Sequence, residues 1–234
     1  MKVLTHDVLI ANEIKYMITD KHLNYGSKLP SERDLSDIFG VQRLTIRSAL
    51  NILIQEGLIY KVKRQGYFVA KPRIGSDIYT LQSSTEFINS LHNGYLELVK
   101  FDDIVVNKYL SSKMKLPLGT KLYEIIRLLR VDEEPISIEY AYIESKRFPA
   151  FKDSFLKERS IYRTLKNKYN EKVMASKQDI VVIKSSKEIS NLLNIKENSN
   201  VILQRGLDYD TRKLLVEYSE LVMKRERVSF DYSD

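Results

Sequence analysis

The sequence predicts an α/β (α+β) chain of two domains, a helical N-terminal domain that ends in a hairpin and a larger domain of strands and helices. In the first part, apolar side chains recur at intervals of three and four, which is the spacing of amphipathic helices. From residue 122 onward they mostly alternate with polar ones, as in strands. Between these parts, residues 71–77 contain the Pro, Gly and Ser typical of a linker. We therefore expect domains over residues 1–71 and 81–234, joined by a linker over 72–80.

The composition of the 234 residues is that of a folded globular protein, with 43% hydrophobic and 29% charged residues. The absence of cysteine excludes disulfides, thiolate nucleophiles and finger-type zinc sites, and it fits a reducing cytoplasm. No run of 18 apolar residues occurs, so we expect a protein that is neither secreted nor membrane-spanning. The three histidines, His6, His22 and His92, are scattered, and we expect no metal, no cofactor and no catalysis.

Positive charge is concentrated near the N-terminus. Residues 1–73 hold 12 Lys and Arg against 7 Asp and Glu, whereas the remaining residues hold 26 against 24. Residues 58–73 carry five basic side chains and no acid: Lys61, Lys63, Arg64, Lys71 and Arg73. Such a patch indicates a polyanion-binding surface, although a solvated basic face is the alternative.

Two helices are predicted before residue 40. The first is amphipathic and covers residues 7–23. The second begins after Ser31, which is placed as N-cap with Asp34 three residues further on, a weaker version of the capping box. It is short and stops at Gly40, where a tight turn is expected.

A third helix and a hairpin complete the first domain. The helix covers residues 42–55, with an apolar stripe on one side and a polar, cationic face on the other. Gly57 ends it, and residues 58–69 alternate like a two-stranded hairpin with Gln65 and Gly66 at its turn.

Two arginines lie in the first two turns of the third helix. A short helix, a tight turn and a cationic second helix match a helix-turn-helix, whose second helix enters the major groove of DNA. Arg43 and Arg47 carry the guanidinium fork that spans guanine O6 and N7. Exposed Leu44 suits a thymine methyl, and Gln42 and Thr45 suit bases or phosphates.

The stretch LPSERDLSDIFGVQRLTIRSALNILIQEGLIYKVKRQGYFV, residues 29–69, resembles the winged helix-turn-helix of GntR-family transcription regulators. The resemblance implies that Arg33, Arg43, Thr45 and Arg47 contact DNA phosphates and bases, and that Gly66 lies at the tip of a wing that reaches toward the minor groove. With the basic residues of the hairpin, the predicted DNA-binding set is Arg33, Gln42, Arg43, Leu44, Thr45, Arg47, Lys63, Arg64 and Gly66.

Three positions depart from the family pattern. Gln42 stands where serine is usual, Arg64 where the first wing glycine is usual, and Tyr67 where threonine is usual. These departures leave the conformation of the wing and the operator sequence open. The alternative to DNA contact is that Arg33 pairs with Glu32 or Asp37 and the helix arginines are merely solvated.

The second domain is predicted to mix strands and helices. The strands cover residues 122–130, 136–143, 179–183, 201–208 and 214–223, and the helices lie near 84–93, 110–116, 160–169 and 187–194. Residues 125–143 and 203–221 repeat at an offset of 78, pairing Arg127 with Arg205 and Glu139 with Glu217 among others. We expect two equivalent hairpins in one sheet, with chance similarity of two hairpins as the alternative.

The pattern around residues 126–139, 160–162 and 216–218 resembles the UTRA effector domain of the HutC branch of the GntR family. The resemblance spans roughly residues 80–234. It implies a chorismate-lyase-like fold with a mainly antiparallel sheet and flanking helices. It also implies a small-metabolite effector, often a sugar phosphate, an amine or a histidine-pathway intermediate.

The resemblance assigns effector contacts to hydroxyl, guanidinium and carboxylate groups, which are the donors and acceptors of an anion and polyol site. The predicted effector-binding residues are Ser84, Thr85, Arg127, Glu139, Ser160, Tyr162 and Glu217. Each also has a structural alternative. Glu139 alternates outward and would be solvated, Ser160 would be a helix N-cap, and Arg127 an ion-pair partner in the sheet; its repeat mate Arg205 is expected to be structural.

Two departures affect the expected site. Leu129 stands at the second position of the family's Arg-Leu-Arg phosphate clamp, and Arg130 points to the opposite face by strand alternation. Met223 replaces an aromatic residue near the pocket. The anion site has therefore lost one donor, and a neutral sugar, an amine or a carboxylate stands beside a phosphorylated ligand as an open alternative.

These features predict a ligand-responsive, sequence-specific DNA-binding transcription regulator. We expect a cytoplasmic homodimer that acts as a repressor on a pseudopalindromic double-stranded operator and is released by a small molecule such as a sugar phosphate or sugar. The alternatives are a constitutive DNA-binding dimer without effector, and a lyase-like enzyme.

Overall fold

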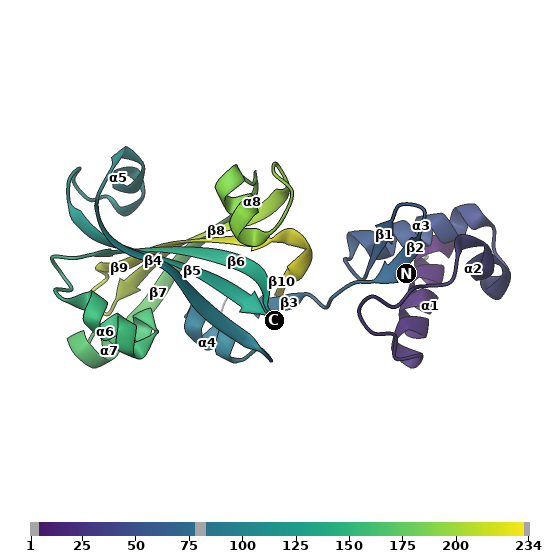
Figure 1. The fold of residues 1–234 in the computed structure, drawn as a ribbon, viewed down its shortest axis with the longest axis horizontal. Helices are drawn as coiled ribbons and strands as arrows, with labels where there is room; N and C mark the ends of the chain where they lie inside the picture. Colours follow the sequence, from purple (N-terminus) through teal and green to yellow (C-terminus); the bar gives the residue numbers. More distant parts are fainter. Residues whose placement is uncertain (1–4, 78–82, 232–234) are drawn as a thin grey trace. The chain divides into compact units, whose positions relative to one another are not determined.

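The computed structural model describes residues 5–77 and 83–231 and is shown as a ribbon in Figure 1. The chain divides into two compact units, with the division between Ile74 and Gly75. Mixed helices and strands confirm the predicted α/β (α+β) class. No helix in the described part of the chain is long and apolar enough to cross a membrane.

The first unit contains three helices and a hairpin around one apolar core. Its elements are α1 (His6–Asp20), α2 (Glu32–Phe39), α3 (Arg43–Gln55), β1 (Ile59–Val62) and β2 (Gly66–Val69). The side chains of Ile14, Leu35, Ile46 and Leu53 are fully buried, and α3 packs against both α1 and α2. Since burying each such side chain contributes about 1.5–3 kcal/mol, this core fixes the angles of the helices.

The start and the end of α2 follow from local chemistry. Ser31 accepts a hydrogen bond from the backbone N–H of Asp34, and the Asp34 carboxylate accepts one from the backbone N–H of Ser31, which is the predicted capping box. Gly40 ends the helix in the left-handed region, at φ 64°. The turn is therefore tight enough to bring α3 directly after α2.

The turn of the hairpin lies earlier than the sequence indicated. Val62 pairs with Gly66, so the loop consists of Lys63, Arg64 and Gln65, and Gly66 is the first residue of β2. Arg64 adopts the left-handed region at φ 64° and thus supplies the backbone conformation that glycine adopts at lower cost. Arginine at this position does not prevent the wing from forming.

The second unit is built on a six-stranded antiparallel sheet in the order β4-β5-β6-β9-β8-β7. Its strands are β4 (Gly94–Val105), β5 (Lys121–Val131), β6 (Glu134–Glu144), β7 (Val173–Lys184), β8 (Asn200–Asp210) and β9 (Leu215–Lys224). Its helices are α4 (Ser84–Asn89), α5 (Lys108–Met114), α6 (Phe151–Glu158), α7 (Ile161–Tyr169) and α8 (Lys187–Leu193). A separate pair joins β3 (Ile74–Asp77) to β10 (Val228–Asp231), and a short 3-10 helix, Arg225–Arg227, precedes β10.

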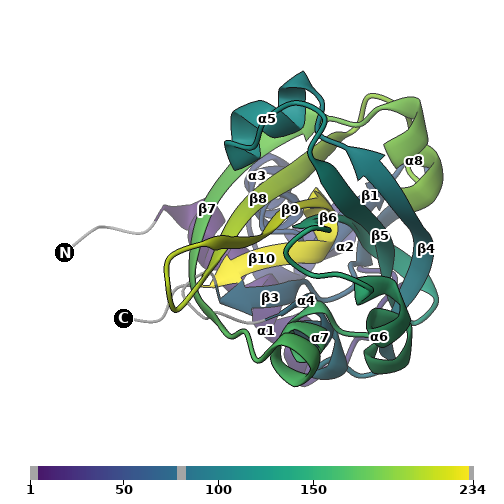
Figure 2. The same ribbon diagram turned by 90° about the vertical axis from the view of Figure 1, so that its left-hand side faces the viewer.

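The internal repeat corresponds to a symmetric sheet. The succession strand, helix, strand, strand occurs first as β4-α5-β5-β6 and again as β7-α8-β8-β9. The two copies meet where β6 pairs with β9. From either edge of the sheet to this centre, the strands are therefore the first, second and third of one copy. Figures 1 and 2 show α5 and α8 on one side of this sheet and α4, α6 and α7 on the other.

The sequence patterns predicted neither β3, β10 and the short 3-10 helix nor two longer elements, β4 and α6. In β4 the register shifts between Leu98 and Lys100, which breaks the alternation that identifies a strand. In α6 no side chain caps the N-terminus, and the flanking residues Ala150 and Arg159 both lie in the left-handed region. The helix predicted near 84–93 ends at Asn89, and Gly94 already begins β4.

Candidate nucleic-acid interface and ligand site

The nine predicted DNA-contacting residues lie on three neighbouring segments of the first unit, namely α2, the start of α3 and the hairpin. None of them is buried. Thr45 and Gly66 are half-buried, and the other seven are exposed: Arg33, Gln42, Arg43, Leu44, Arg47, Lys63 and Arg64. Leu44 is 70% exposed, an unusual position for leucine unless a partner covers it.

The N-terminus of α3 leaves its polar groups available to a partner. Gln42 is the N-cap residue, but its side chain makes no capping hydrogen bond. Arg33 and Arg43 are exposed, and within the described residues Arg33 makes no ion pair with Glu32 or Asp37, its two proposed partners; Glu32 binds Arg47 and Tyr67 instead. The ion-pair alternative for Arg33 is therefore wrong. Helix N-termini also favour anions, so this end of α3 suits a phosphate backbone.

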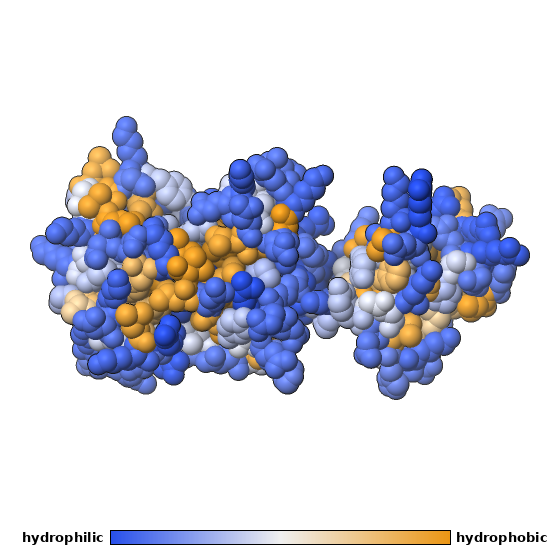
Figure 3. All heavy atoms as spheres, in the orientation of Figure 1, coloured by the Kyte–Doolittle hydropathy of each residue, from blue (hydrophilic) through white to orange (hydrophobic). Residues whose placement is uncertain are grey.

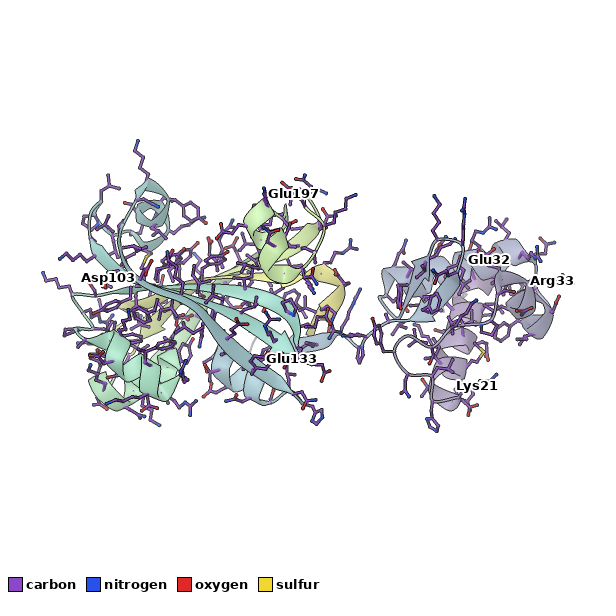
Figure 4. All side chains as sticks on the ribbon, in the orientation of Figure 1. Lys21, Glu32, Arg33, Asp103, Glu133 and Glu197 are labelled. Carbon is purple, nitrogen blue, oxygen red and sulfur yellow. The ribbon has the colours of Figure 1, made fainter. Side chains whose placement is uncertain are left out.

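Arg47 is held by a network that joins α2, α3 and the hairpin. Its Nη2 lies 2.9 Å from Glu32 Oε2, and the Tyr67 hydroxyl donates to Glu32 Oε1 at 2.8 Å. Figure 4 shows Glu32 on the part of α2 near α3 and Arg33 at the outer edge of the unit. The hydrogen bond from Arg47 is the main cause that lowers the pKa of Glu32, and Tyr67 adds to it. Tyr67, the departure from threonine, thus links the wing to α2, and through Glu32 to Arg47 on α3.

In the second unit, six of the seven predicted effector residues lie in one buried polar cluster. They come from α4, β5, β6, α7 and β9, on the face of the sheet that α6 and α7 also cover. The cluster consists of Ser84, Thr85, Arg127, Glu139, Tyr162 and Glu217, together with Asp208. Arg127, Glu139 and Glu217 are each 3% exposed.

Arg127 and Glu139 form the centre of the cluster. They are directly paired across β5 and β6, and Nε and Nη2 of Arg127 both bind Glu139 Oε2. Nη1 of Arg127 donates to Thr85 Oγ1 at 3.1 Å, and the Ser84 hydroxyl donates to Glu139 Oε1. The alternative of a solvated Glu139 is therefore wrong, because Glu139 is buried and Ser84 of α4 contacts it. The ion-pair alternative for Arg127 is right and is compatible with ligand binding.

Asp208 is a member of the cluster that the sequence patterns did not reveal. It pairs directly with Glu217 across β8 and β9 and is 6% exposed. The Tyr162 hydroxyl donates to its Oδ2 at 2.9 Å. Burial raises the pKa of Asp208, and burial together with the Asp208 and Glu139 charges raises that of Glu217 well above its usual range. The sequence could have revealed Asp208 through strand pairing: in the hairpin of β8 and β9, Asp208 is the residue directly opposite Glu217.

Ser160, Leu129 and Met223 lie apart from the polar centre. Ser160 is buried and its side chain accepts from the backbone N–H of Arg163, so it caps α7. Leu129 and Met223 each pair across the sheet with Ser137, and both are buried. The two departures from the family pattern are thus neighbours on the face that carries Glu139, and they make this end of the face apolar.

Two other arginines of the sheet, Arg205, the repeat mate of Arg127, and Arg130, lie outside the cluster. Arg205 lies on the opposite face and binds Asp179 and Glu220 through partly exposed contacts. Arg130 binds Glu97, also near the surface. The alternation of β5 therefore separates Arg130 from the cluster, as its spacing predicted.

Two family descriptions match this chain. Residues 94–229 match "UTRA domain", and residues 8–69 match "Bacterial regulatory proteins, gntR family". The matched ranges cover the sheet of the second unit and the three helices and hairpin of the first.

Relatives resemble the chain over nearly its full length. The HTH-type transcriptional repressor NagR of Bacillus subtilis is 26% identical, over 94% of this chain and 91% of that protein. The mannosyl-D-glycerate transport/metabolism system repressor MngR of Escherichia coli is 25% identical, over 94% and 92%. The crystal structure of PhnF from Mycobacterium smegmatis shares the fold, with a TM-score of 0.66, 20% identity, and coverage of 96% of this chain and 98% of that one.

Proposed function

Because this chain belongs to the gntR family of bacterial regulatory proteins and carries the UTRA domain, it is a DNA-binding transcription regulator and not an enzyme, and we propose that it is a repressor. It binds operator DNA through α3 and the hairpin, and a small metabolite bound in the polar cluster releases it. The single observation that supports a metabolite site is the buried cluster itself. Burying three carboxylates costs free energy, and a sheet that served only as a scaffold would gain no stability from it.

The proposed DNA contacts are those of the nine surface residues. Arg43 and Arg47 read guanine edges, Leu44 packs on a thymine methyl, and the hairpin residues Lys63 and Arg64 neutralise phosphates. The names of NagR and MngR both describe repressors, which supports the sign of regulation.

The protein acts as a homodimer on a pseudopalindromic operator in the cytoplasm, where chromosomal DNA lies. The sheet of the second unit ends in two edge strands, β4 and β7, whose backbone groups have no further strand to pair with among the described residues. Both expose apolar side chains, among them Val99 and Val182. Figure 3 shows hydrophobic residues crossing the middle of the visible face of this unit, where the strands lie. Such edges favour the addition of a second copy.

The test is a binding titration of the full chain against DNA from upstream of its own gene and neighbouring genes, with unrelated DNA of equal length. We expect one fragment to bind more tightly than the unrelated DNA, in proportion of two chains per site, and light scattering to give twice the chain mass. Equal affinity for all fragments would contradict the proposal. A constitutive DNA-binding dimer would instead bind its operator with no response to any metabolite.

A further inference from the structure

The polar cluster of the second unit contains more buried negative charge than positive charge. Arg127, Glu139, Asp208 and Glu217 are all at least 94% buried. Arg127 and Glu139 neutralise one another through their ion pair. Asp208 and Glu217 remain, two carboxyl groups that form no ion pair within the described residues, although the charge of Arg127 acts on Glu217 from a greater distance.

Arg127 has little capacity left for a negatively charged ligand. Its Nε and Nη2 bind Glu139, and its Nη1 binds Thr85. Its guanidinium also lies over the ring of Phe155, 5.9 Å from the centroid. The position of a second guanidinium on this face is occupied by buried Leu129. A phosphate group would therefore meet one engaged arginine and a pair of carboxyl groups, Asp208 and Glu217, that carries at least one negative charge and repels it.

Asp208 and Glu217 are neighbours that differ in the hydrogen bonds their carboxylates accept. They are directly paired across β8 and β9, so their Cβ atoms are about 4.5–5.5 Å apart. Asp208 accepts from the Tyr162 hydroxyl and pairs directly with Ser176 across β7 and β8. Glu217 is 3% exposed, and in the described parts of the chain no donor binds its carboxylate. A buried carboxylate without a donor is rare, and it marks a group that awaits a partner.

The excess negative charge can be removed in two ways. In the empty protein a proton neutralises one of the pair, in keeping with the raised pKa of both carboxyl groups. With a ligand bound, a positive charge takes the place of that proton. Among residues 5–77 and 83–231, no three His, Asp or Glu side chains are grouped so that a metal ion fits.

We propose that the effector is a cationic amine with hydroxyl groups, whose ammonium is held by Asp208 and Glu217, and not a phosphorylated compound. This rests on the proposed function of the cluster as the effector site. The charged and titratable groups that face the ammonium are Asp208 from β8, Glu217 from β9, Glu139 from β6, Arg127 from β5 and Tyr162 from α7. Binding of the amine expels the shared proton to solvent.

The test compares compounds that share a skeleton and differ in charge. The probes are glucosamine, glucose and glucose 6-phosphate, and in parallel 1-amino-1-deoxysorbitol, sorbitol and sorbitol 6-phosphate. We expect the amine of a set to raise the melting temperature of the full chain most, and calorimetry in two buffers of different ionisation enthalpy to show proton release. A larger shift with a phosphorylated compound, an equal shift with a neutral one, a shift with magnesium chloride alone, or no shift with either amine overturns the proposal.

Variants identify the carboxylates responsible. Glu217→Gln and Asp208→Asn remove a charge but keep size and are expected to weaken amine binding about tenfold or more, as loss of a charged hydrogen bond does. Glu220→Gln is the matched control, because it lies on the same strand but on the opposite face of the sheet. Equal weakening in all three variants overturns the proposal.

Operator binding of the same samples without any compound separates the two hypotheses. A chain that binds its operator but responds to a phosphorylated compound refutes the amine alone. A chain that binds no DNA specifically refutes the proposed function, whatever it does with amines.

Discussion

Replacing Arg127 by leucine should destabilise the second unit strongly. The side chains of Arg127 and Glu139 are each 4% exposed, so the ion pair is buried. Removal of one partner of a buried pair leaves the other charge uncompensated and costs about 3–5 kcal/mol. Here the cost falls at the upper end of that range, because Asp208 and Glu217 add negative charge beside Glu139. For a unit of this size, such a loss lowers the melting temperature by about 6–20 °C.

The measurement is equilibrium unfolding in urea at pH 7.5, followed by circular dichroism, with thermal melting of the same samples. The control is Arg205→Leu, the same substitution at the repeat mate of Arg127. The Arg205 side chain is 21% exposed and that of its partner Asp179 is 56% exposed, so we expect a loss below about 1 kcal/mol. The double variant Arg127→Leu/Glu139→Leu should recover most of the stability that Arg127→Leu loses, since it leaves no unpaired charge.

Two results would refute this reasoning. Equal losses in Arg127→Leu and Arg205→Leu would show that burial of the pair does not decide its contribution. A double variant that recovers nothing would assign the loss to packing of the guanidinium on Phe155 and not to the Glu139 charge.

Three further predictions concern the DNA surface and the pH dependence of stability. Arg43→Ala should weaken binding to the operator by about 1–3 kcal/mol but change binding to unrelated DNA much less, because base contacts carry the specificity. A titration at fixed salt measures both affinities. Equal losses on the two DNAs would exclude base reading by Arg43. Tyr67→Phe removes a hydrogen bond to Glu32 and should cost about 0.5–1.5 kcal/mol of stability in the first unit; its operator affinity should fall as well, and an unchanged affinity would show that the contact does not help to place Arg47. Because the folded-state pKa of Glu217 lies above its usual value of 4.5, the folded chain keeps a proton that the unfolded chain loses, so this group lowers the free energy of unfolding as the pH rises above 4.5. Glu217→Gln should remove this part of the pH dependence and raise the melting temperature at pH 7.5. If the melting temperatures of variant and wild type differ by the same amount at every pH from 5.5 to 8, the pKa of Glu217 is not raised in the folded chain.

The sequence by itself determined the elements whose signals are local. The capping residues Ser31 and Asp34, the turn at Gly40 and the stripe on α3 depend on neighbours within a few residues, so the winged helix-turn-helix is readable in one dimension. The two repeated hairpins are readable for the same reason, because their strands alternate and their turns are short. The expectation that Arg43 and Arg47 lie on the exposed face of α3 likewise required only helical spacing.

The tertiary structure decided what depends on register and on contacts distant in the chain. The bulge in β4 and the uncapped α6 carry no local signal, and the position of the hairpin turn depended on the left-handed backbone of Arg64. Spacing alone could not tell whether Glu139 faces water, because α4 covers it from 55 residues away.

The same holds for the charge of the proposed effector site. Arg127 and Glu217 are far apart in the sequence, and Asp208 joins the site only because it pairs with Glu217 across β8 and β9. The sequence shows which acids and bases exist. Only the packed sheet decides which of them share one buried volume, and it is there, where water no longer screens them, that two carboxylates without a cation become a preference for one kind of ligand.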